Sequence, residues 1–448
     1  MTGDTSGGRP NLLVVLTDQQ RWDTLGAYGC PMDLTPNLDA LAREGCTVEQ
    51  AISPQPLCGP FRAAFQTGKY ATETGVWRNS MPLPEKESTL ADYVRAAGYE
   101  AGFVGNWHLA GTFDEPVGPE RRGGYDDYWV GADIAEFTTQ PTSGRLFDAD
   151  GEPVTFDRYR ADAFTDLALE AVETLSEPFL LVVSYVEPHN QNDQWTFVAP
   201  DGYAGRHEKN PYVPGDLDGR PGDWYSELPD YYGMVERLDE CVGRLLEGLD
   251  REGVREETVV AYASDHGCHF RTRPGEYKRT SHESAVRVPA VFAGPGFRER
   301  GDVDRVASLV DVVPTLLDAA GIDVPPAVHG ESLLPAADGE TAGDADAFVQ
   351  VSESQIGRAL RTDRYKYAVA APSRDGWRSG SGDQRSDVYV ERYLYDLARD
   401  PHERVNLVSH PEYREVAQRL RDRLVERIAT VEGDSPEVRQ LEKGYRDY

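Results

Sequence analysis

The sequence has no long apolar runs. No stretch of its 448 residues approaches the roughly 18 consecutive apolar residues that a membrane span needs. The first ten residues are polar and rich in glycine, without the basic start or the apolar core of a secretory signal peptide. The first apolar run, Leu12 to Leu16, has only the length of a strand. We therefore expect no membrane segment and a cytoplasmic location.

Cysteine is also scarce. The five cysteines are odd in number, lie far apart and show no CxxC spacing: Cys30, Cys46, Cys58, Cys241 and Cys268. This pattern indicates neither a disulfide framework nor a structural zinc site.

Lysine is rare, because it occurs only at Lys69, Lys86, Lys209, Lys278, Lys366 and Lys443. Acidic residues number 77 against 46 basic ones, which gives a net charge of -31, and they are spread along the whole chain. Such a surface suits a protein that stays hydrated in a high-salt cytosol, so we interpret the chain as halophilic. Attraction to a cationic partner would instead predict clustered acids. Nucleic-acid binding is disfavoured, because phosphates would meet a negative surface.

Strand-length apolar runs alternate with segments of helical periodicity. Strands are expected at residues 11–16, 101–104, 179–185, 258–263 and 288–292, and helices at residues 36–44, 60–66, 162–175, 229–253 and 311–320. Alternation of this kind predicts an α/β fold, with a large mixed, mostly parallel sheet sandwiched by helices.

A second, smaller unit is expected after residue 345, because the chain exceeds the usual size of one compact core. Residues 335–346 are rich in alanine, glycine and acids and are typical of a linker. Beyond them, hairpin strands at 359–367 and 392–397 and a helix at 411–431 predict a C-terminal α+β subdomain. We therefore divide the chain into residues 1–345 and 346–448, and the oligomeric state stays open.

Polar residues follow four of the expected strands directly: Asp18 and Gln19, Asn106 and His108, Glu187 and His189, and Asp265 and His266. The carboxyl ends of parallel strands meet at one edge of a sheet, where ligands gather. Two carboxylates, an amide oxygen and an imidazole form a mixed oxygen and nitrogen set that suits Ca²⁺, Mg²⁺ or Mn²⁺. The sequence therefore predicts a divalent-metal site at this edge.

Cys58 precedes Gly59 and Pro60 at the start of an expected helix. A cysteine in this setting is, taken alone, more often a small buried residue than a reactive one. A helix start, however, offers free N–H groups to an anion. With Arg62 and Lys278 added, the predicted metal site becomes a trap for a tetrahedral oxyanion, and phosphate and sulfate esters are the natural substrates.

The chain resembles the sulfatase family of the alkaline-phosphatase superfamily over nearly its whole length. The motifs that carry the resemblance are Leu-Thr-Asp-Gln at 16–19, Cys-x-Pro-x-Arg at 58–62, Gly-Asn-Trp-His at 105–108, Ser-Asp-His-Gly at 264–267, His-Glu-Ser-Ala-Val-Arg-Val-Pro at 282–289, and Leu-Tyr-Asp-Leu at 394–397 with Asp-Pro-His-Glu at 400–403.

The resemblance implies that a formylglycine-generating enzyme converts Cys58 to formylglycine (3-oxoalanine). Its hydrate has two hydroxyls: one attacks sulfur, and the other expels sulfate by C–O cleavage. The implied ligands of the metal, Ca²⁺ before Mn²⁺ or Mg²⁺, are Asp18, Gln19, Asp265 and His266.

The resemblance assigns roles to further residues. Arg62 would orient the formylglycine, and His108 would take a proton from its second hydroxyl. His189 and Lys278 would bind the ester and stabilise the leaving oxygen. Asn106 stands where the family has a lysine, and both Asn106 and His282 are expected to contact the substrate.

Three functions stay open at this point. The first is a sulfuric-ester hydrolase acting on a sulfated carbohydrate or an aryl sulfate. The Asp-Gln and Asp-His pairs also resemble those of phosphonate monoester hydrolases and phosphodiesterases, which gives the second. The third, a non-catalytic metal-holding binding protein, is disfavoured because the cysteine, the arginine and both aspartates are present.

Aromatic residues between 190 and 228 form either a sugar-stacking wall or ordinary loop packing, namely Trp195, Tyr203, His207, Tyr212 and Trp224.

Overall fold

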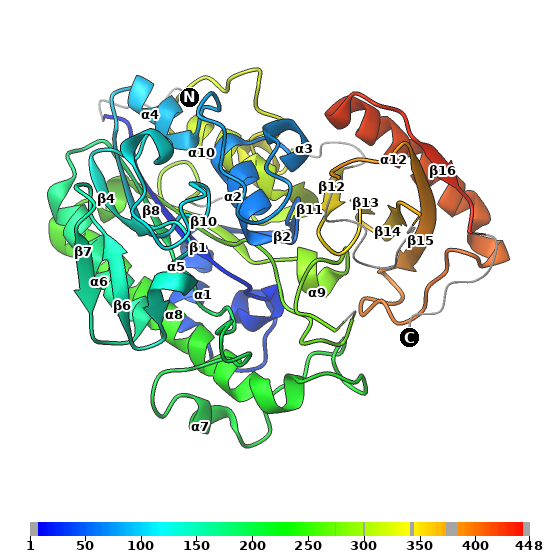
Figure 1. Ribbon diagram of the computed structural model, residues 1–448, viewed down its shortest axis with the longest axis horizontal. Helices are drawn as coiled ribbons and strands as arrows, with labels where there is room; N and C mark the ends of the chain where they lie inside the picture. Colours follow the sequence, from blue (N-terminus) through cyan, green and yellow to red (C-terminus); the bar gives the residue numbers. More distant parts are fainter. Residues whose placement is uncertain (1–7, 274, 299–300, 341–344, 373–382, 442–448) are drawn as a thin grey trace.

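The computed structural model describes residues 8–273, 275–298, 301–340, 345–372 and 383–441. Two sheets organise these residues, and Figure 1 shows the smaller sheet, crossed by helix α12, beside the larger one. The α/β fold with a C-terminal α+β unit is therefore confirmed. The second sheet begins at Asp346, and the division of the chain at residue 345 stays a prediction.

The larger sheet has eleven strands within the described residues, in the order β11-β2-β10-β9-β1-β8-β3-β4-β6-β5, with β7 paired to β6. These strands are β1 (Asn11–Thr17), β2 (Cys46–Ile52), β3 (Glu100–Asn106), β4 (Tyr128–Ala132), β5 (Thr139–Gln140), β6 (Ser143–Phe147), β7 (Pro153–Phe156), β8 (Phe179–Ser184), β9 (Thr258–Ser264), β10 (Ala290–Ala293) and β11 (Val303–Ser308). The five neighbours β9, β1, β8, β3 and β4 run parallel, whereas β10 runs antiparallel to β9 and β2.

The α-helices are α1 (Pro36–Glu44), α2 (Cys58–Thr67), α3 (Ala71–Thr74), α4 (Leu90–Ala96), α5 (Ala135–Thr138), α6 (Arg160–Thr174), α7 (Ala204–His207), α8 (Trp224–Glu252), α9 (Glu283–Val286), α10 (Val312–Ala319), α11 (Leu334–Ala337) and α12 (Arg414–Glu432). Short 3-10 helices lie at Trp22–Thr24, Gly26–Tyr28, Pro119–Arg121, Arg255–Glu257, Leu309–Asp311 and Pro411–Tyr413. Among the described residues, every helix is too short or too polar to cross a membrane.

Both faces of the central strand β1 are buried, as its uninterrupted apolar sequence predicts. Leu12, Val14 and Leu16 pack in one cluster with residues of α2, α4 and α10. Leu13 and Val15 point to the opposite face and pack with residues of α1, α6 and α8. The sheet is thus enclosed between two helical layers, and its polar groups collect at the strand ends.

The C-terminal sheet has the strand order β12 (Asp346–Val351), β13 (Gly357–Thr362), β14 (Tyr365–Ala370), β15 (Val388–Asp396) and β16 (Glu437–Arg439). Its pairs are antiparallel except the last, β15 with β16. One face packs on Leu420, Leu424 and Ile428 of α12. The other face packs on Ile52, Val286 and Val306, so the small sheet is fixed to the edge of the large one.

Several boundaries differ from the expectation, three of them in ways that change an element. Helix α8 begins at Trp224 and includes Pro229, which the sequence pattern had placed at the helix start. Pro229 cannot donate a hydrogen bond to the carbonyl of Tyr225, a residue that is 72% exposed, so the helix continues through the proline on a side that faces solvent. Residues 359–367 form parts of two strands rather than one, and α11 (Leu334–Ala337) overlaps the start of the expected linker.

Candidate active site

The carboxyl ends of four parallel strands bring their polar residues to one place. Thr17 of β1 pairs with Ser264 of β9, so Asp18 and Asp265 leave the sheet side by side. The Asp265 amide donates a hydrogen bond to the Thr17 carbonyl (3.1 Å), and the Asp18 amide donates to the Glu187 carbonyl (3.2 Å). The loops after β1, β8 and β9 are therefore joined through their backbones.

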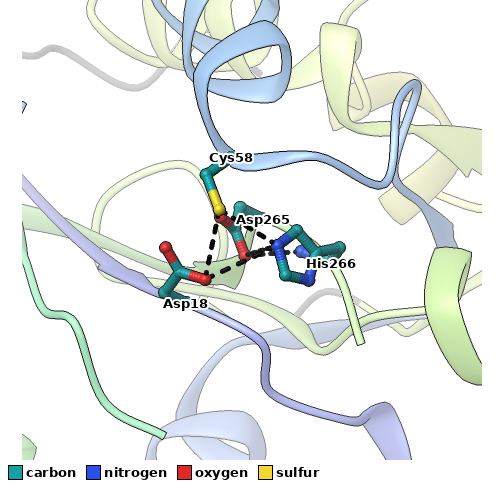
Figure 2. A group of neighbouring side chains, drawn as sticks. All are labelled: Asp18, Cys58, Asp265 and His266. Atoms are coloured by element: carbon teal, nitrogen blue, oxygen red, sulfur yellow. Dashed lines mark hydrogen bonds and ion pairs between the residues drawn. The ribbon is translucent and has the colours of Figure 1, made fainter. Parts of the chain in front are cut away.

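Cys58 is the first residue of α2, and its side chain points at this group (Figure 2). Its Sγ lies 3.6 Å from Asp18 Oδ1 and 3.4 Å from His266 Nε2. His266 Nε2 lies 3.5 Å from both Asp18 Oδ1 and Asp265 Oδ1. The potential ligand atoms of these four buried residues all lie within 4.8 Å of one another.

Two side-chain oxygen atoms among the expected metal ligands lack hydrogen-bond partners. Among the described residues, Gln19 Oε1 and Asp265 Oδ2 are buried and accept no hydrogen bond. A buried acceptor without a donor costs free energy unless another positive group satisfies it. Asp18, Gln19, Asp265 and His266 supply carboxylate, amide and imidazole donors of the kind that hard divalent cations prefer, so the residues fit a metal ion.

Gln19 is held in an uncommon backbone conformation, with φ at 70°. A non-glycine residue in this region usually needs support from its surroundings. The Gln19 amide donates to Asp265 Oδ1 (3.0 Å), and the Tyr231 hydroxyl of α8 donates to the Gln19 carbonyl (2.8 Å). Tyr231 is fully buried and thus positions one of the expected metal ligands from the far helical layer.

Arg62 joins helix α2 to the strand ends. Its Nη1 donates to the Asn106 carbonyl (2.7 Å) and to Ser184 Oγ, and its Nη2 lies 3.2 Å from Asp18 Oδ2. Strands β3 and β8 approach so closely here that a Cβ on Gly105 (φ 109°) would lie 2.1 Å from the Ser184 carbonyl oxygen. Arg62 is 2% exposed, and Asp18 forms an ion pair with it.

Lys278 is the cation that faces the Cys58 side chain. Its Nζ lies 2.9 Å from Cys58 Sγ, 3.0 Å from His189 Nε2 and 3.1 Å from His266 Nε2. Burial alone would lower the pKa of Lys278, but Cys58 and Asp18 outweigh it and raise that pKa. Lys278 is therefore an ammonium cation next to neutral nitrogen acceptors.

The two flanking histidines are neutral. Burial, reinforced by Arg62, lowers the pKa of His108 to about 3. Burial and Lys278 lower the pKa of His189 to about 3 as well. The Asp18 pKa is also lowered, because His189, Lys278, His266 and Arg62 outweigh the effect of burial. At neutral pH the group thus has an ionised Asp18 and imidazoles that can accept protons.

A cavity of about 400 Å³ opens onto Cys58, and Gln19, His108, His189 and Lys278 also line it. The remaining lining residues are Asn79, Ser80, Ile134, Glu136, Phe137, Asn190, Asn192, Trp195, Gly275, Glu276, Tyr277 and Arg279. Space for an ester therefore lies directly in front of the Cys58 side chain.

Two expected substrate residues lie elsewhere. The Asn106 side chain accepts from the Ala135 amide (3.0 Å), and Asn106 does not line the cavity. His282 Nε2 is 3.2 Å from the Tyr395 hydroxyl, and its ring packs on Tyr393 of the C-terminal sheet. Asn106 therefore supports Arg62 through its carbonyl and His282 joins the two sheets, and a substrate contact of either residue stays a prediction.

The aromatic residues between 190 and 228, for which a sugar-stacking wall and ordinary loop packing were both open, divide between the two. Of its five aromatic residues only Trp195 lines the cavity. Tyr203 donates to Glu240 and His207 bonds to Glu236, so both belong to the packing around α8.

Several supporting residues were not predicted. Ser184 had a detectable signal, because it is a polar residue at the end of an apolar strand. Tyr231 had none, because only the folded chain brings it to the site.

The family model described as Sulfatase matches residues 10–322, and the model for the C-terminal region of N-sulphoglucosamine sulphohydrolase matches residues 275–378. The chain belongs to the sulfatase family. It is a hydrolase of sulfate esters, and the motifs at 16–19, 58–62, 105–108, 264–267 and 282–289 lie within the matched region 10–322, whereas those at 394–397 and 400–403 lie beyond both matches.

Named relatives agree with this assignment. The chain is 31% identical to the ulvan-active sulfatase of Formosa agariphila, over 94% of this chain and 81% of that protein. It is 24% identical to the N-acetylglucosamine-6-O-sulfatase of Bacteroides thetaiotaomicron, over 98% and 90% of the two chains. Its fold matches that of a protein solved in complex with its substrate D-glucosamine-2-N,6-O-disulfate. The TM-score is 0.80, and the identity is 23% over 96% of this chain and 99% of that one.

We predict that Tyr231→Phe weakens the binding of a divalent ion by roughly tenfold or more, as loss of a ligand-orienting contact typically does. The substitution removes the hydroxyl that fixes the Gln19 carbonyl and leaves the ring in place. Calorimetric titration of the chelator-treated protein with Ca²⁺ measures the effect.

Tyr232→Phe is the matched control, because it removes a hydroxyl on the same helix that bonds to the Tyr212 carbonyl, away from the site. Equal Ca²⁺ affinities for the two variants would show that Tyr231 does not position Gln19.

Proposed function

We propose that this sulfatase cleaves sulfate monoesters of carbohydrates through a formylglycine derived from Cys58. The observation that carries the proposal is the position of Cys58 Sγ, 2.9 Å from Lys278 Nζ and 3.4 Å from His266 Nε2, at the floor of the cavity. The substrates named for two similar proteins are sulfated sugars, which supports a carbohydrate ester.

Asp18, Gln19, Asp265 and His266 would hold the divalent ion, for which we propose Ca²⁺ before Mn²⁺ or Mg²⁺. When bound, the ion supplies positive charge that acidifies a hydroxyl at position 58 and stabilises the oxygens of the sulfate group. The partnerless Gln19 Oε1 and Asp265 Oδ2 support this assignment.

After conversion, position 58 supplies one hydroxyl for attack on sulfur and a second whose deprotonation expels sulfate by C–O cleavage. Arg62, fixed by Asp18 and by the Asn106 carbonyl, holds the start of α2 in place during both stages. Lys278 neutralises the sulfate charge and has a proton for the leaving oxygen, with His189 at 3.0 Å to orient it. The neutral His108 imidazole is available as the base for the second hydroxyl.

We predict that the enzyme prefers sulfur over phosphorus. The purified protein should hydrolyse 4-nitrophenyl sulfate with a higher kcat/KM than bis-4-nitrophenyl phosphate or 4-nitrophenyl phenylphosphonate. Cys58→Ala should abolish all three activities and serves as the control for contaminating enzymes. A large preference for either phosphorus ester would favour the phosphonate or phosphodiester hydrolase instead, and folded protein without any of these activities would favour a binding protein.

We predict that position 58 of active protein is 3-oxoalanine. Trypsin releases residues 44–62 as one peptide, which contains both Cys46 and Cys58. After alkylation with iodoacetamide, fragment masses should show one adduct, on Cys46, and the mass of 3-oxoalanine or its hydrate at position 58. Cys46 is thus an internal control for alkylation. Fully active protein with adducts on both cysteines would refute the proposed chemistry.

We further propose that the protein works in a cytoplasm of high ionic strength, on the basis of its net charge of -31. Dissolved salt shortens the range of repulsion between surface carboxylates, to a Debye length of about 3 Å at 1 M. Circular dichroism and activity should therefore persist in molar KCl and decline in dilute buffer. Sucrose of equal osmolality is the control, because it does not screen charge. Full stability in dilute buffer would contradict the proposal.

A further inference from the structure

Two carboxylates line the cavity without being needed for the proposed reaction. Glu136 lies in helix α5 and Glu276 in the loop that leads to Lys278. Each has one buried oxygen, Glu136 Oε2 and Glu276 Oε1, that accepts no hydrogen bond from any described residue. Burial raises the pKa of both groups. Unsatisfied buried acceptors are costly, so the cavity is arranged for a ligand that donates hydrogen bonds.

The positive charges of the cavity are already engaged. Among the described lining residues, Lys278 and Arg279 are the only lysine and arginine. Lys278 contacts Cys58, where the sulfate group must lie. Arg279 donates to Glu276 (2.8 Å) and to Glu353 of the C-terminal segment (2.8 Å). A second anion on the substrate would therefore face two carboxylates without a free lysine or arginine to receive it.

Exposed aromatic rings complete the cavity. Trp195 is 65% exposed and Phe137 is 59% exposed, and both line the cavity. Phe137 stacks on Phe113 with their ring centroids 6.5 Å apart. Phe113 and Trp195 have φ of 63° and 55°, which bulky residues rarely adopt, so the fold places these rings at a cost. Flat apolar surfaces beside hydrogen-bond acceptors suit a sugar ring.

We propose that the substrate carries its sulfate on a sugar residue that has free hydroxyls, no other charge and no second anionic substituent. Hydroxyl groups donate to the partnerless oxygens of Glu136 and Glu276. A second sulfate or a uronate carboxylate meets like charge, which penalises binding. The sulfate ester of a quaternary ammonium alcohol, such as choline sulfate, has a positive charge opposite to that of the two carboxylates but no N–H or O–H hydrogen to donate to them. The inference rests on the proposed function and names the class of substrate that the same site accepts.

Binding to the Cys58→Ser protein tests the inference without formylglycine. Calorimetry compares the 4-sulfates and 6-sulfates of methyl galactoside and methyl glucoside with the same sugars that carry a second sulfate. The best singly sulfated sugar should bind about tenfold or more tightly than its doubly sulfated counterpart, as the cost of like charges predicts. In Cys58→Ser combined with Glu136→Gln and Glu276→Gln, this ratio should fall towards one.

Glu115→Gln is the matched control in the same background. It removes an exposed carboxylate near Phe113 that does not line the cavity, so it should leave the ratio unchanged. Equal or tighter binding of the doubly sulfated sugars would overturn the inference, and so would a ratio that the Gln substitutions do not alter. Tighter binding of choline sulfate than of every sugar would overturn it too.

Activity separates failure of this inference from failure of the proposed function. Hydrolysis of 4-nitrophenyl sulfate together with a preference for doubly sulfated sugars would retain the sulfatase chemistry and overturn the inference alone. Absence of sulfate release from every ester would overturn the proposed function, whereas the binding ratio would still decide what the cavity prefers.

Discussion

The buried guanidinium of Arg62 is the interaction on which the site depends. It contacts the ends of three strands at once, through Asp18 after β1, the carbonyl of Asn106 at the end of β3, and Ser184 at the end of β8. A charge that is 2% exposed must be paired and hydrogen-bonded to be tolerated. Helix α2 can therefore dock in only one register. Because Cys58 precedes Arg62 by four residues, one helical turn, the same ion pair also sets where the Cys58 side chain points.

Burial and the charge of Asp18 together divide the site into charged and neutral groups. The imidazoles of His108 and His189 lose their charge, since the pKa of each falls to about 3, whereas the pKa values of Arg62 and Lys278 are raised. Asp18 supports both cations. A sulfate ester is an anion that must be held while a proton moves, and these tasks need different groups. Burial alone would lower the pKa of lysine, arginine and histidine alike. The enzyme nevertheless has a fixed cation and a neutral base within a few ångströms of each other.

The sequence predicts the parts of this arrangement that are local and misses those that depend on distant packing. Apolar strands followed by Asp18, Asn106, His189 or Asp265 predict the metal edge, because parallel strands end together. His282 lies four residues after Lys278 and was expected in the cavity, but the tyrosines of the C-terminal sheet draw its ring away. Tyr231 was hidden, because a tyrosine on a helix that also packs on apolar neighbours looks like core. Pro229 displaced the expected start of α8, since exposure of the freed carbonyl was not visible in the chain.

The charges of the cavity differ from those of the protein surface. Lys278 contacts Cys58, Arg62 is buried against Asp18 without lining the cavity, Glu136 and Glu276 line the cavity, and the chain as a whole has a net charge of -31. If the whole cavity were cationic, it would attract any polyanion, and Lys278 beside Cys58 would then contribute little to the discrimination between sulfate esters. With carboxylates lining the cavity and Lys278 beside Cys58, the substrate proposed above gains only if its single anionic group reaches Cys58. High salt weakens the long-range repulsion that a sulfate meets on approach, whereas the buried contacts are screened much less. The proposed selectivity can therefore persist at the high ionic strength that we propose for this protein, because it is set inside the cavity.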